Sequence, residues 1–266
     1  EAGAPGAWGL PLEASVLEAV SRQVDVDGLI SIAGQRGFLS WQNWFTDRGA
    51  DGPVIAVAAG KGFTPWSRDS IEVLRSAGAE VRRLDLVEHS RLPPGTAGLI
   101  LAGTLWPGAV LDIAMNTALL EEIGKHVAGG LPTLALGGGT LLLVDKVQDS
   151  LGRRSDLAAA VPATGEILWD LEKPVYVEMT SRCDSVLLAR GESITGWVLT
   201  EAEITNPGEG WMSPFSVPEE GMSEGHPEGA ASGSLLCSRV LLHLAATPEA
   251  APRFVRRCAE YAALPR

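Results

Sequence analysis

The sequence predicts an α/β fold with a mostly parallel sheet and helices on both faces. Apolar runs of strand length alternate with helix-length segments from residue 53 to residue 147, which is the pattern of a parallel sheet. Hydrophobic residues make up 45% of the 266 residues and charged residues 20%, as is ordinary for such a protein. From about residue 155, short extended runs replace the alternation and predict an antiparallel extension of the same sheet.

The elements are expected in the following order along the chain. Residues 1–12 are rich in Gly, Pro and Ala, typical of a tail or linker, and residues 17–32 have helical apolar spacing interrupted at 25–28. The parallel sheet has predicted strands near 54–59, 80–84, 98–102 and 133–136 and predicted helices near 67–77, 109–128 and 139–147. The predicted extension uses runs at 166–169, 175–179, 185–188 and 194–198, then a mobile loop over 206–234 and a strand over 235–243. A final helix is expected to start with Thr247 as its N-cap and Pro248 as its first residue.

The most informative stretch is residues 131–143, Leu-Pro-Thr-Leu-Ala-Leu-Gly-Gly-Gly-Thr-Leu-Leu-Leu. A buried strand that stops at a sharp turn before a helix is the geometry of a nucleophile elbow, which presents its turn residue at the carboxyl end of a parallel sheet. Gly137 holds that position and carries no nucleophile. The glycine triplet is also explained by a tight turn, or by free N–H groups at a helix start that bind an anion.

Several motifs in residues 51–150 resemble the glutamine amidotransferase domain of the cobyrinic acid a,c-diamide synthase family. Residues 54–58 resemble its first strand, 71–81 its N-L-E-x-L-R-x-A-G-A-E-V segment, and 92–103 its L-P-x-x-x-x-G-L-I-L-G-G stretch. Residues 130–135 enter its A-E-C-G-G elbow. In this alignment Leu136 replaces the glutamate and Gly137 replaces the catalytic cysteine.

The second half carries a weaker resemblance to the same family. Residues 237–244, Cys-Ser-Arg-Val-Leu-Leu-His-Leu, resemble its A-S-Y-V-H-L-H-F run, which puts Leu241 at the catalytic histidine and His243 at the second, non-catalytic one. Residues 196–200 stand where the family has G-H-E-F-H. Three active-site motifs are thus lost while the scaffold is kept.

The resemblance implies a flavodoxin-like class I glutamine amidotransferase-like domain over residues 53–265. An N-terminal tail and interdomain-type segment over residues 1–52 precedes it. The Val-Asp-Val-Asp-Gly-Leu-Ile-Ser-Ile-Ala run at 24–33 resembles the segment that closes the family's ATP-dependent domain. Because the chain begins with Glu1, we expect a processed or excised piece of a longer protein.

Candidate site residues follow from the resemblance, and none of them is catalytic, because Gly137 and Leu241 are degenerate. Gly138 N–H, with one from the Gly103 loop, would resemble an oxyanion hole. Trp66, Trp106 and Trp197 map to loops around the glutamine pocket, where they either pack in the ordinary way or fill the pocket and offer a face to a partner or macrocycle. The candidate binding residues are therefore Gly103, Trp106, Gly138, Trp197 and His243.

His243 lies in an apolar run, which is more typical of a packed, hydrogen-bonded histidine than of a base. Cys237, the nearest cysteine, would lie about 20 Å from it along one strand. The remaining histidines are isolated, so no metal site is expected. Three scattered cysteines form no disulfide framework and favour a reducing cytoplasm.

The composition excludes some partners and cofactors. A net charge of −12 argues against nucleic acid, whose binding depends on cations that neutralise phosphates. No apolar run approaches the ~18–20 residues that span a bilayer, so no membrane insertion is expected. No G-x-x-x-x-G-K-[S/T] loop occurs, and Gly60-Lys61-Gly62 lacks its spacing, so the chain needs no cofactor of its own.

For function, the resemblance implies a cobyrinic acid a,c-diamide synthase-like protein of tetrapyrrole (cobalamin-type) cofactor biosynthesis with an inactive glutaminase site. That family makes side-chain amides with ATP and glutamine, so this chain would need a partner, either an ATP-dependent synthetase domain or a separate synthetase subunit. The alternative is a non-enzymatic pseudo-amidotransferase, a binding or scaffold subunit for a partner protein. A third interpretation is an enzyme that recruited new residues to the old pocket, and a homo-oligomer also stays open.

Overall fold

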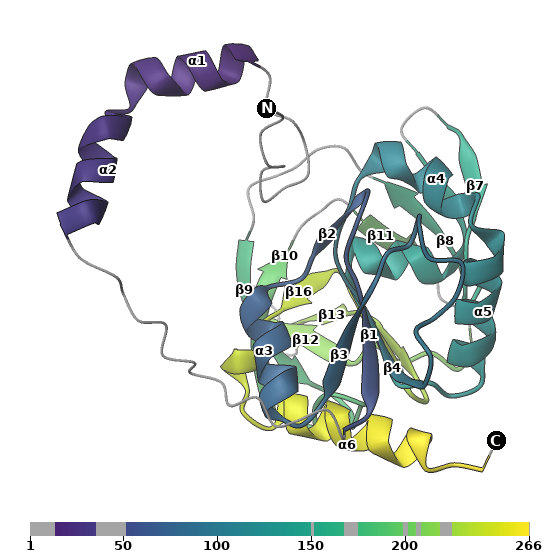
Figure 1. Ribbon diagram of the computed structural model, residues 1–266. Helices are drawn as coiled ribbons and strands as arrows, with labels where there is room; N and C mark the ends of the chain where they lie inside the picture. The colour runs from purple at the N-terminus through teal and green to yellow at the C-terminus, as the bar shows by residue number, and fades with distance from the viewer. Residues whose placement is uncertain are drawn as a thin grey trace. The chain divides into compact units, whose positions relative to one another are not determined.

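The computed structural model describes residues 14–35, 52–149, 152–167, 175–198, 202–205, 209–218 and 225–265 (Figure 1). The chain divides into two compact units, residues 1–44 and residues 45–266. The boundary expected from the sequence, between residues 52 and 53, lies slightly further along the chain. The tail predicted over residues 1–12 lies outside the described residues.

Within its described residues, 14–35, the first unit contains the helices α1 (Ala14–Gln23) and α2 (Val26–Gln35). The helical spacing and its interruption are confirmed. Asp25 lies between the helices, and its Oδ1 accepts a hydrogen bond from the N–H of Gly28 at 2.9 Å. An acidic side chain in this place satisfies an orphan donor of the first turn and so starts the second helix.

The second unit is built on a mixed sheet whose central strands are parallel, as predicted. Its order is β14-β15-β5-β4-β1-β3, with β2 paired to β4. The five parallel strands follow the order 2-1-3-4-5 of flavodoxin-like folds. The strands are β1 (Val54–Ala58), β2 (Phe63–Pro65), β3 (Glu80–Leu84), β4 (Thr96–Leu105), β5 (Thr133–Gly137), β14 (Ala230–Ser232) and β15 (Leu235–Ser238).

Alternate residues of this sheet enter two separate cores, one on each face. On one face Leu99 and Ala135 pack in a cluster with residues of α4 (Val110–Ala114) and α5 (Thr117–Ala128). On the other face Ile100 and Leu134 pack with residues of α3 (Arg68–Ser76) and α6 (Ala250–Ala262). Figure 1 shows α5 and α6 on opposite faces of the sheet. The predicted layers are confirmed.

Two predicted helices differ from the structure. The segment 109–128 is broken into η1 (Pro107–Ala109), α4 and α5. The backbone of Asn116 is not helical (φ −85°, ψ 57°), and its side-chain amide donates to the carbonyl of Leu86 at 2.8 Å. The helix predicted at 139–147 is wrong. A 3-10 helix, η2 (Gly138–Leu143), is followed by strand β6 (Val144–Gln148). A register shift between Val144 and Lys146, as in a β-bulge, accompanies the burial of both Val144 and Val147 although they are three residues apart.

The first sheet is extended antiparallel by β14, which pairs with β15, but the runs predicted at 166–198 lie in two further sheets, so their placement in the first sheet is wrong. A five-stranded sheet has the order β13-β12-β9-β10-β16, and a four-stranded sheet has the order β11-β8-β6-β7. The run 185–188 is a turn region, in which Ser185 Oγ accepts from the N–H of Leu187 at 3.2 Å. The strands are β7 (Arg154–Asp156), β8 (Val161–Ile167), β9 (Val175–Ser181), β10 (Ser193–Val198), β11 (Ala202–Thr205), β12 (Phe215–Val217), β13 (His226–Glu228) and β16 (Val240–Leu242).

The C-terminal quarter also departs from its prediction in detail. The expected loop at 206–234 contains β12, β13 and β14, and the expected strand at 235–243 is two strands in different sheets. A short 3-10 helix, η3 (Leu244–Ala246), precedes α6, whose N-cap residue is Glu249. The hydroxyl of Thr247 donates instead to the carbonyl of Ser193 at 2.7 Å, so it does not cap the helix.

Candidate functional site

The residue that ends strand β5 has a backbone conformation that suits glycine. Gly137 has φ 60° and ψ −132°, a region that residues with a Cβ adopt only under strain. Because η2 begins at the next residue, the chain turns sharply at the carboxyl end of the parallel sheet. The predicted strand and elbow are present, although a 3-10 helix follows in place of an α-helix.

The space in front of Gly137 is already occupied. A Cβ added there would lie 2.8 Å from Cδ2 and 3.1 Å from Cγ of Leu241, and 2.8 Å from the carbonyl oxygen of Gly103. Contacts under 3.0 Å essentially do not occur for real Cβ atoms. A side chain at residue 137 would therefore require Leu241 to turn aside and the backbone carbonyl of Gly103 to shift.

The other two glycines of the triplet allow strand β4 to approach the turn. A Cβ on Gly138 would lie 2.5 Å from the backbone nitrogen of Leu105, and one on Gly139 would lie 1.6 Å from the carbonyl oxygen of Leu101. Backbone atoms cannot withdraw as a flexible side chain can. The tight-turn interpretation of the triplet thus accounts for Gly138 and Gly139 without an anion.

The position of Leu241 depends on a bend between two sheets. Strand β15 pairs with β5 in the large sheet, and β16 pairs with β10 in the five-stranded sheet. At the bend the Ser238 hydroxyl donates to Glu228 at 3.1 Å to Oε1 and 2.9 Å to Oε2, and the N–H of Arg239 donates to Oε1 at 3.0 Å. The N–H of Val240 donates to the Ser238 hydroxyl at 3.0 Å. This network fixes the direction in which β16 leaves, two residues before Leu241.

Burial raises the pKa of the Glu228 carboxyl above its ordinary value, against the hydrogen bonds from Ser238 and Arg239. The sequence interpretation missed this residue, because it lies in a Gly- and Pro-rich stretch that was assigned to a loop. In the sequence, a carboxylate between Pro227 and Gly229 is only a weak indication of a buried, hydrogen-bonded glutamate.

Cys237 does not supply a substitute nucleophile. Its side chain is buried, and burial, followed by the nearby charge of Glu228, raises the pKa of the thiol to about 12. The thiolate is the reactive form of cysteine, so this thiol is inert near neutral pH. Cys237 and His243 also do not share a strand, as the sequence interpretation assumed, since they lie on either side of the bend at Arg239.

Solved structures with a similar fold are glutamine amidotransferases and related proteins. A putative GMP synthase component from Thermoplasma acidophilum matches with a TM-score of 0.53 at 16% identity, over 80% of this chain and 97% of its own. A second structure, described as a glutamine amidotransferase, matches with a TM-score of 0.53 at 18% identity, over 80% of this chain and 100% of its own. The fold is that of class I glutamine amidotransferases.

Comparison with curated sequences gives more specific relatives than the solved structures do. Hydrogenobyrinate a,c-diamide synthase of Thermobifida fusca is 28% identical over 89% of this chain and 52% of its own length. Cobyrinate a,c-diamide synthase of Caldanaerobacter subterraneus is 28% identical over 78% of this chain and 45% of its own length. The chain is a relative of the cobyrinate a,c-diamide synthases.

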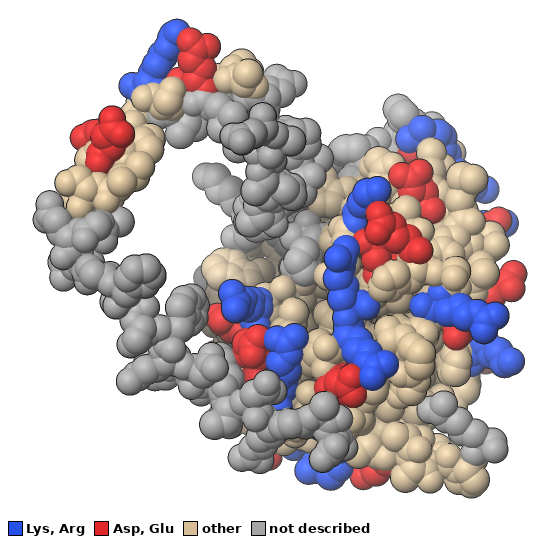
Figure 2. Space-filling model, in the orientation of Figure 1, with Lys and Arg blue, Asp and Glu red and all other residues tan. Residues whose placement is uncertain are grey.

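The chain spans about half the length of the synthases that it matches. No protein-family model matches it. None of the helices in the described residues is long and apolar enough to cross a membrane. Within the same residues, no group of three or more His, Cys, Asp or Glu side chains is arranged to hold a metal ion. Figure 2 shows acidic and basic side chains interspersed over one face.

Two candidate residues taken from the synthase resemblance lie at the elbow itself. Gly138 follows Gly137 directly, and Gly103 is the partner of Gly137 in the pairing of β4 with β5. Gly103 belongs to strand β4 and not to a loop. Strand β2 pairs with residues 103–105 of β4, so β4 continues beyond Gly103. It presents its carbonyl oxygen, 2.8 Å away, toward the position of a Cβ on residue 137. That carbonyl would oppose, and not stabilise, negative charge at this point.

The three tryptophans matched to the glutamine-pocket loops of the synthases have different environments. Trp66 is buried and its Nε1–H donates to the carbonyl of Leu242 at 2.8 Å, so it packs beside β16. Trp106 is 38% exposed after the end of β4, and its backbone N–H donates to the carbonyl of Gly62 at 2.9 Å. Trp197 is 47% exposed and lies within β10, so its assignment to a loop is wrong.

Trp197 forms a row with residues on the two neighbouring strands. It is in register with Leu241 on β16 and with Tyr176 on β9, so the three side chains share one face of the five-stranded sheet. Its ring packs edge-on against Tyr176, with centroids 5.2 Å apart. Leu241, which lies against Gly137, is therefore on the same sheet face as the exposed pair Tyr176 and Trp197. Trp106 lies on a separate segment.

His243 lies two residues beyond Leu241, at the start of η3. Its backbone N–H donates to the carbonyl of Thr195 at 3.0 Å. Among the described residues no hydrogen bond to its imidazole is formed, and the packed, hydrogen-bonded histidine expected from the sequence stays a prediction. The residue is half-buried.

Proposed function

We propose that this chain is a cobyrinate a,c-diamide synthase-like amidotransferase domain whose glutaminase site is closed. It acts in tetrapyrrole, cobalamin-type cofactor biosynthesis without releasing ammonia from glutamine. The single observation that carries the proposal is the contact of Leu241 with the position of a side chain at Gly137. The synthase resemblance aligns these two residues with the catalytic histidine and cysteine, and the structure brings them together.

The contact supports the loss of the whole catalytic arrangement, and not of one catalytic group alone. A glutaminase needs a thiolate, a base within reach and donors for the oxyanion. Gly137 supplies no thiol, Leu241 supplies no base, and the nearest buried thiol, Cys237, has a pKa of about 12. A return of the cysteine alone would meet the Leu241 side chain, so the two replacements maintain each other.

Amidation then requires a second protein and another nitrogen source. Because the sequence holds no P-loop, ATP-dependent activation of a carboxylate falls to a synthetase, present as another domain or as a separate protein. Ammonia would come from solution or from another glutaminase. The cytoplasm, where free ammonia and reduced thiols are available, is the compartment that we propose.

The test uses the chain together with a P-loop synthetase domain from a cobyrinate a,c-diamide synthase. Amide formation on cobyrinic and hydrogenobyrinic acids is measured with ATP and either glutamine or ammonium chloride. The complete Thermobifida fusca synthase serves as the control for substrate quality. We expect turnover with ammonium only. Turnover with glutamine at a similar rate would overturn the proposal.

A second candidate function is that of a non-enzymatic scaffold, and the aromatic row favours it. Tyr176 and Trp197 are 57% and 47% exposed, beside the closed elbow. Aromatic rings at the edge of a filled pocket are typical of anchors for a partner protein. This function predicts a stable complex with the synthetase that forms no amide with either nitrogen source and weakens on Trp197→Ala.

A further inference from the structure

Glu228 is a buried carboxyl group that the proposed function does not use. It ends strand β13 and is 5% exposed. Burial of a charged carboxylate is costly unless a cation or hydrogen bonds compensate for the lost water. The neighbours of Glu228 therefore decide what its ionisation does to the structure.

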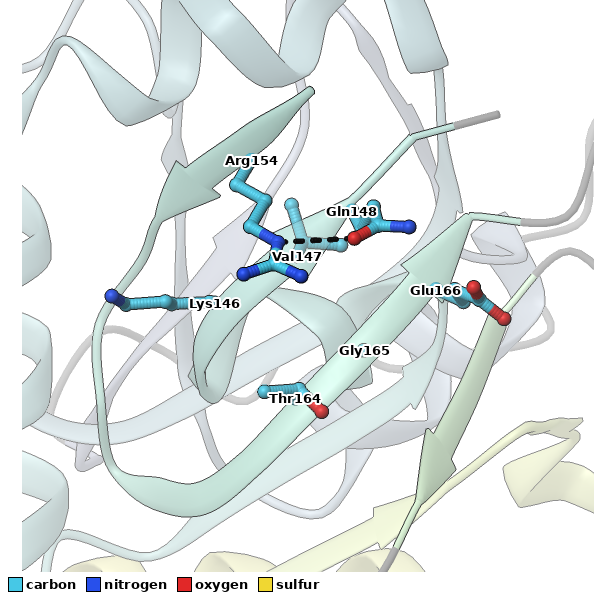
Figure 3. Close-up of a pocket in the computed structure, with 7 residues that line it drawn as sticks. All are labelled: Lys146, Val147, Gln148, Arg154, Thr164, Gly165 and Glu166. Atoms are coloured by element: carbon cyan, nitrogen blue, oxygen red, sulfur yellow. Dashed lines mark hydrogen bonds between the residues drawn. The ribbon is translucent and has the colours of Figure 1, made fainter. Parts of the chain in front are cut away.

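Two other carboxylates have environments that differ from that of Glu228. Asp85 is also buried, but its Oδ2 accepts from Arg83 Nη2 at 2.8 Å. Glu166 is exposed and borders a groove on the four-stranded sheet, where its carboxylate projects from β8 (Figure 3). No ion pair joins Glu228 to a Lys or Arg of the described residues. Its charge is thus compensated by hydrogen bonds alone.

The hydrogen bonds of Glu228 go to the residues at which the chain passes from one sheet to another. Ser238 is the last residue that pairs with β5, and Val240 is the first that pairs with β10. The N–H of Arg239, between them, donates to Glu228 Oε1 at 3.0 Å. The Ser238 hydroxyl donates to both carboxyl oxygens and accepts from the N–H of Val240. The carboxyl group thus satisfies donors that the change of sheet removes from a strand ladder.

This bend is directly coupled to the elbow. Ser238 pairs with Leu136, which precedes Gly137. The residues before and after Leu241 are 0% and 1% exposed in the core, whereas Leu241 lies on the other face of β16, against the turn. A change at the bend can therefore tilt β16 about its buried side chains and move Leu241 relative to Gly137.

Ionisation of Glu228 opposes the closed bend. Burial raises the pKa of this carboxyl above its ordinary value, against the hydrogen bonds from Ser238 and Arg239. In a loosened bend water reaches the carboxylate, so the closed bend binds the proton more tightly than the loosened one. By linkage, closure is most favourable below pH 4.5 and weakens as pH rises through the pKa of the closed form.

The protonated carboxyl keeps its contacts at the bend. Its O–H at Oε2 can donate to Ser238 Oγ, 2.9 Å away, while Oε1 still accepts from the N–H of Arg239. Neutral Glu228 therefore needs no compensating charge and loses no partner.

Few other groups near Glu228 change their charge. Of the described residues, Arg239 at the bend and Cys237 on β15 act on it electrostatically, and β12 places Phe215 opposite it. Arg239 stays charged. Burial, followed by the charge of Glu228, raises the pKa of the Cys237 thiol to about 12, so this thiol stays neutral. The nearby histidines are His226, on the same strand, and His243, after β16.

We propose that Glu228 controls the closure of the elbow through its protonation. The protonated carboxyl, bonded to Ser238 and Arg239, holds Leu241 over Gly137, and loss of the proton loosens that contact. This inference rests on the closed elbow of the proposed function, but its readout is the contact between two residues and not amide formation.

The test is NMR of the full chain with labelled leucine methyl groups. The nuclear Overhauser effect between a Leu241 δ-methyl group and the Gly137 Hα is measured from about pH 4 to about pH 8. We expect it to weaken as pH rises and to recover when the pH is lowered again. An effect that is absent at every pH would contradict the closed elbow itself. An effect that stays constant over this range would overturn only the control by Glu228.

Variants assign the pH dependence to one group. Glu228→Gln carries a neutral side chain that can make the same hydrogen bonds, so it should keep the low-pH strength of the effect throughout. His226→Gln and His243→Gln should keep the pH dependence of the wild type. The same pH dependence in Glu228→Gln, or its loss in either histidine variant, would overturn the proposal.

A second pair of variants tests the bend without a titration. Ser238→Ala removes the hydroxyl that joins Glu228 to Val240, and it should weaken the effect between Leu241 and Gly137 at every pH. Thr133→Val is the control, since it removes a buried hydroxyl at the other end of β5 that donates to the carbonyl of residue 131. Equal weakening in both variants would show that general destabilisation, and not the bend, moves Leu241.

Discussion

The Cδ2 atom of Leu241 lies 2.8 Å from the position that a Cβ on Gly137 would occupy. The two residues come from strands of different sheets, so no local sequence pattern forces the contact. It exists because the chain bends at Arg239 and carries β16 over the elbow. The residues that we propose as the counterparts of the synthases' nucleophile and base are therefore neighbours, and neither carries a thiol or an imidazole.

Gly137→Ala should destabilise the protein by about 2–4 kcal/mol, because it adds backbone strain to a steric clash. Gly130→Ala is the matched control. Gly130 also has a positive φ, of 89°, but nothing lies within 4 Å of an added Cβ. We expect about 1 kcal/mol from strain alone. Urea unfolding measures both, and equal losses would show that Leu241 does not obstruct residue 137.

The clash with Leu241 should be separable from the strain. Leu241→Ala alone should cost about 1–2 kcal/mol, since its side chain is only half-buried. In Gly137→Ala/Leu241→Ala the second alanine should cost less than it does alone, with a coupling of about 0.5–3 kcal/mol. Additive losses in the double-mutant cycle would refute the contact.

The sequence predicts the parallel half of this fold well, for a physical reason. Strands such as Val54–Ala58 are covered on both faces and so form continuous apolar runs. The Gly-rich turn at 137 also carries a local signal. Closure of the elbow is different, because Leu241 looks like any other apolar strand residue until the register of β16 is known.

The antiparallel half depends on pairing between distant segments. Short strands such as His226–Glu228 contain Pro and Gly neighbours and gain their structure from register, which a single sequence does not show. The predicted helix after the elbow fails because Gly138 and Gly139 pack against β4, and residues 144–148 then form a strand by pairing with β7 and β8. The role of Glu228 is missed because its strand, β13, is also defined only by pairing with a distant segment.

Glu228 should make the stability of the protein depend on pH. Its pKa is raised above 4.5 in the folded state, so the folded chain binds a proton more tightly than the unfolded chain does. The free energy of unfolding should therefore fall as pH rises from about 4.5 through the folded pKa, and this cost is absent at lower pH.

Glu228→Gln removes that titration. Its stability relative to wild type should rise over the same pH window and stay constant at lower pH. Unfolding by urea from about pH 4 to pH 8 measures the difference, with the exposed Glu260→Gln as the control. A difference that does not vary with pH would show that the buried carboxyl is not the cause.

Glutamine should not bind measurably to the chain. In the alignment that we propose, Gly137 and Leu241 stand where the synthases have a thiol and an imidazole, and the Leu241 side chain lies beside the turn. A zwitterion would lose its hydration there without compensating hydrogen bonds. Isothermal titration calorimetry with glutamine should give no heat above dilution, and micromolar affinity would contradict a closed pocket.

Ammonia release from glutamine tests the central claim most directly. The purified chain, alone and with its synthetase, should release no more ammonia than the buffer, and Cys237→Ser should change nothing. Release above the buffer value would contradict a dead glutaminase site. If Cys237→Ser abolished that release, the nucleophile would have moved from the elbow to the buried thiol.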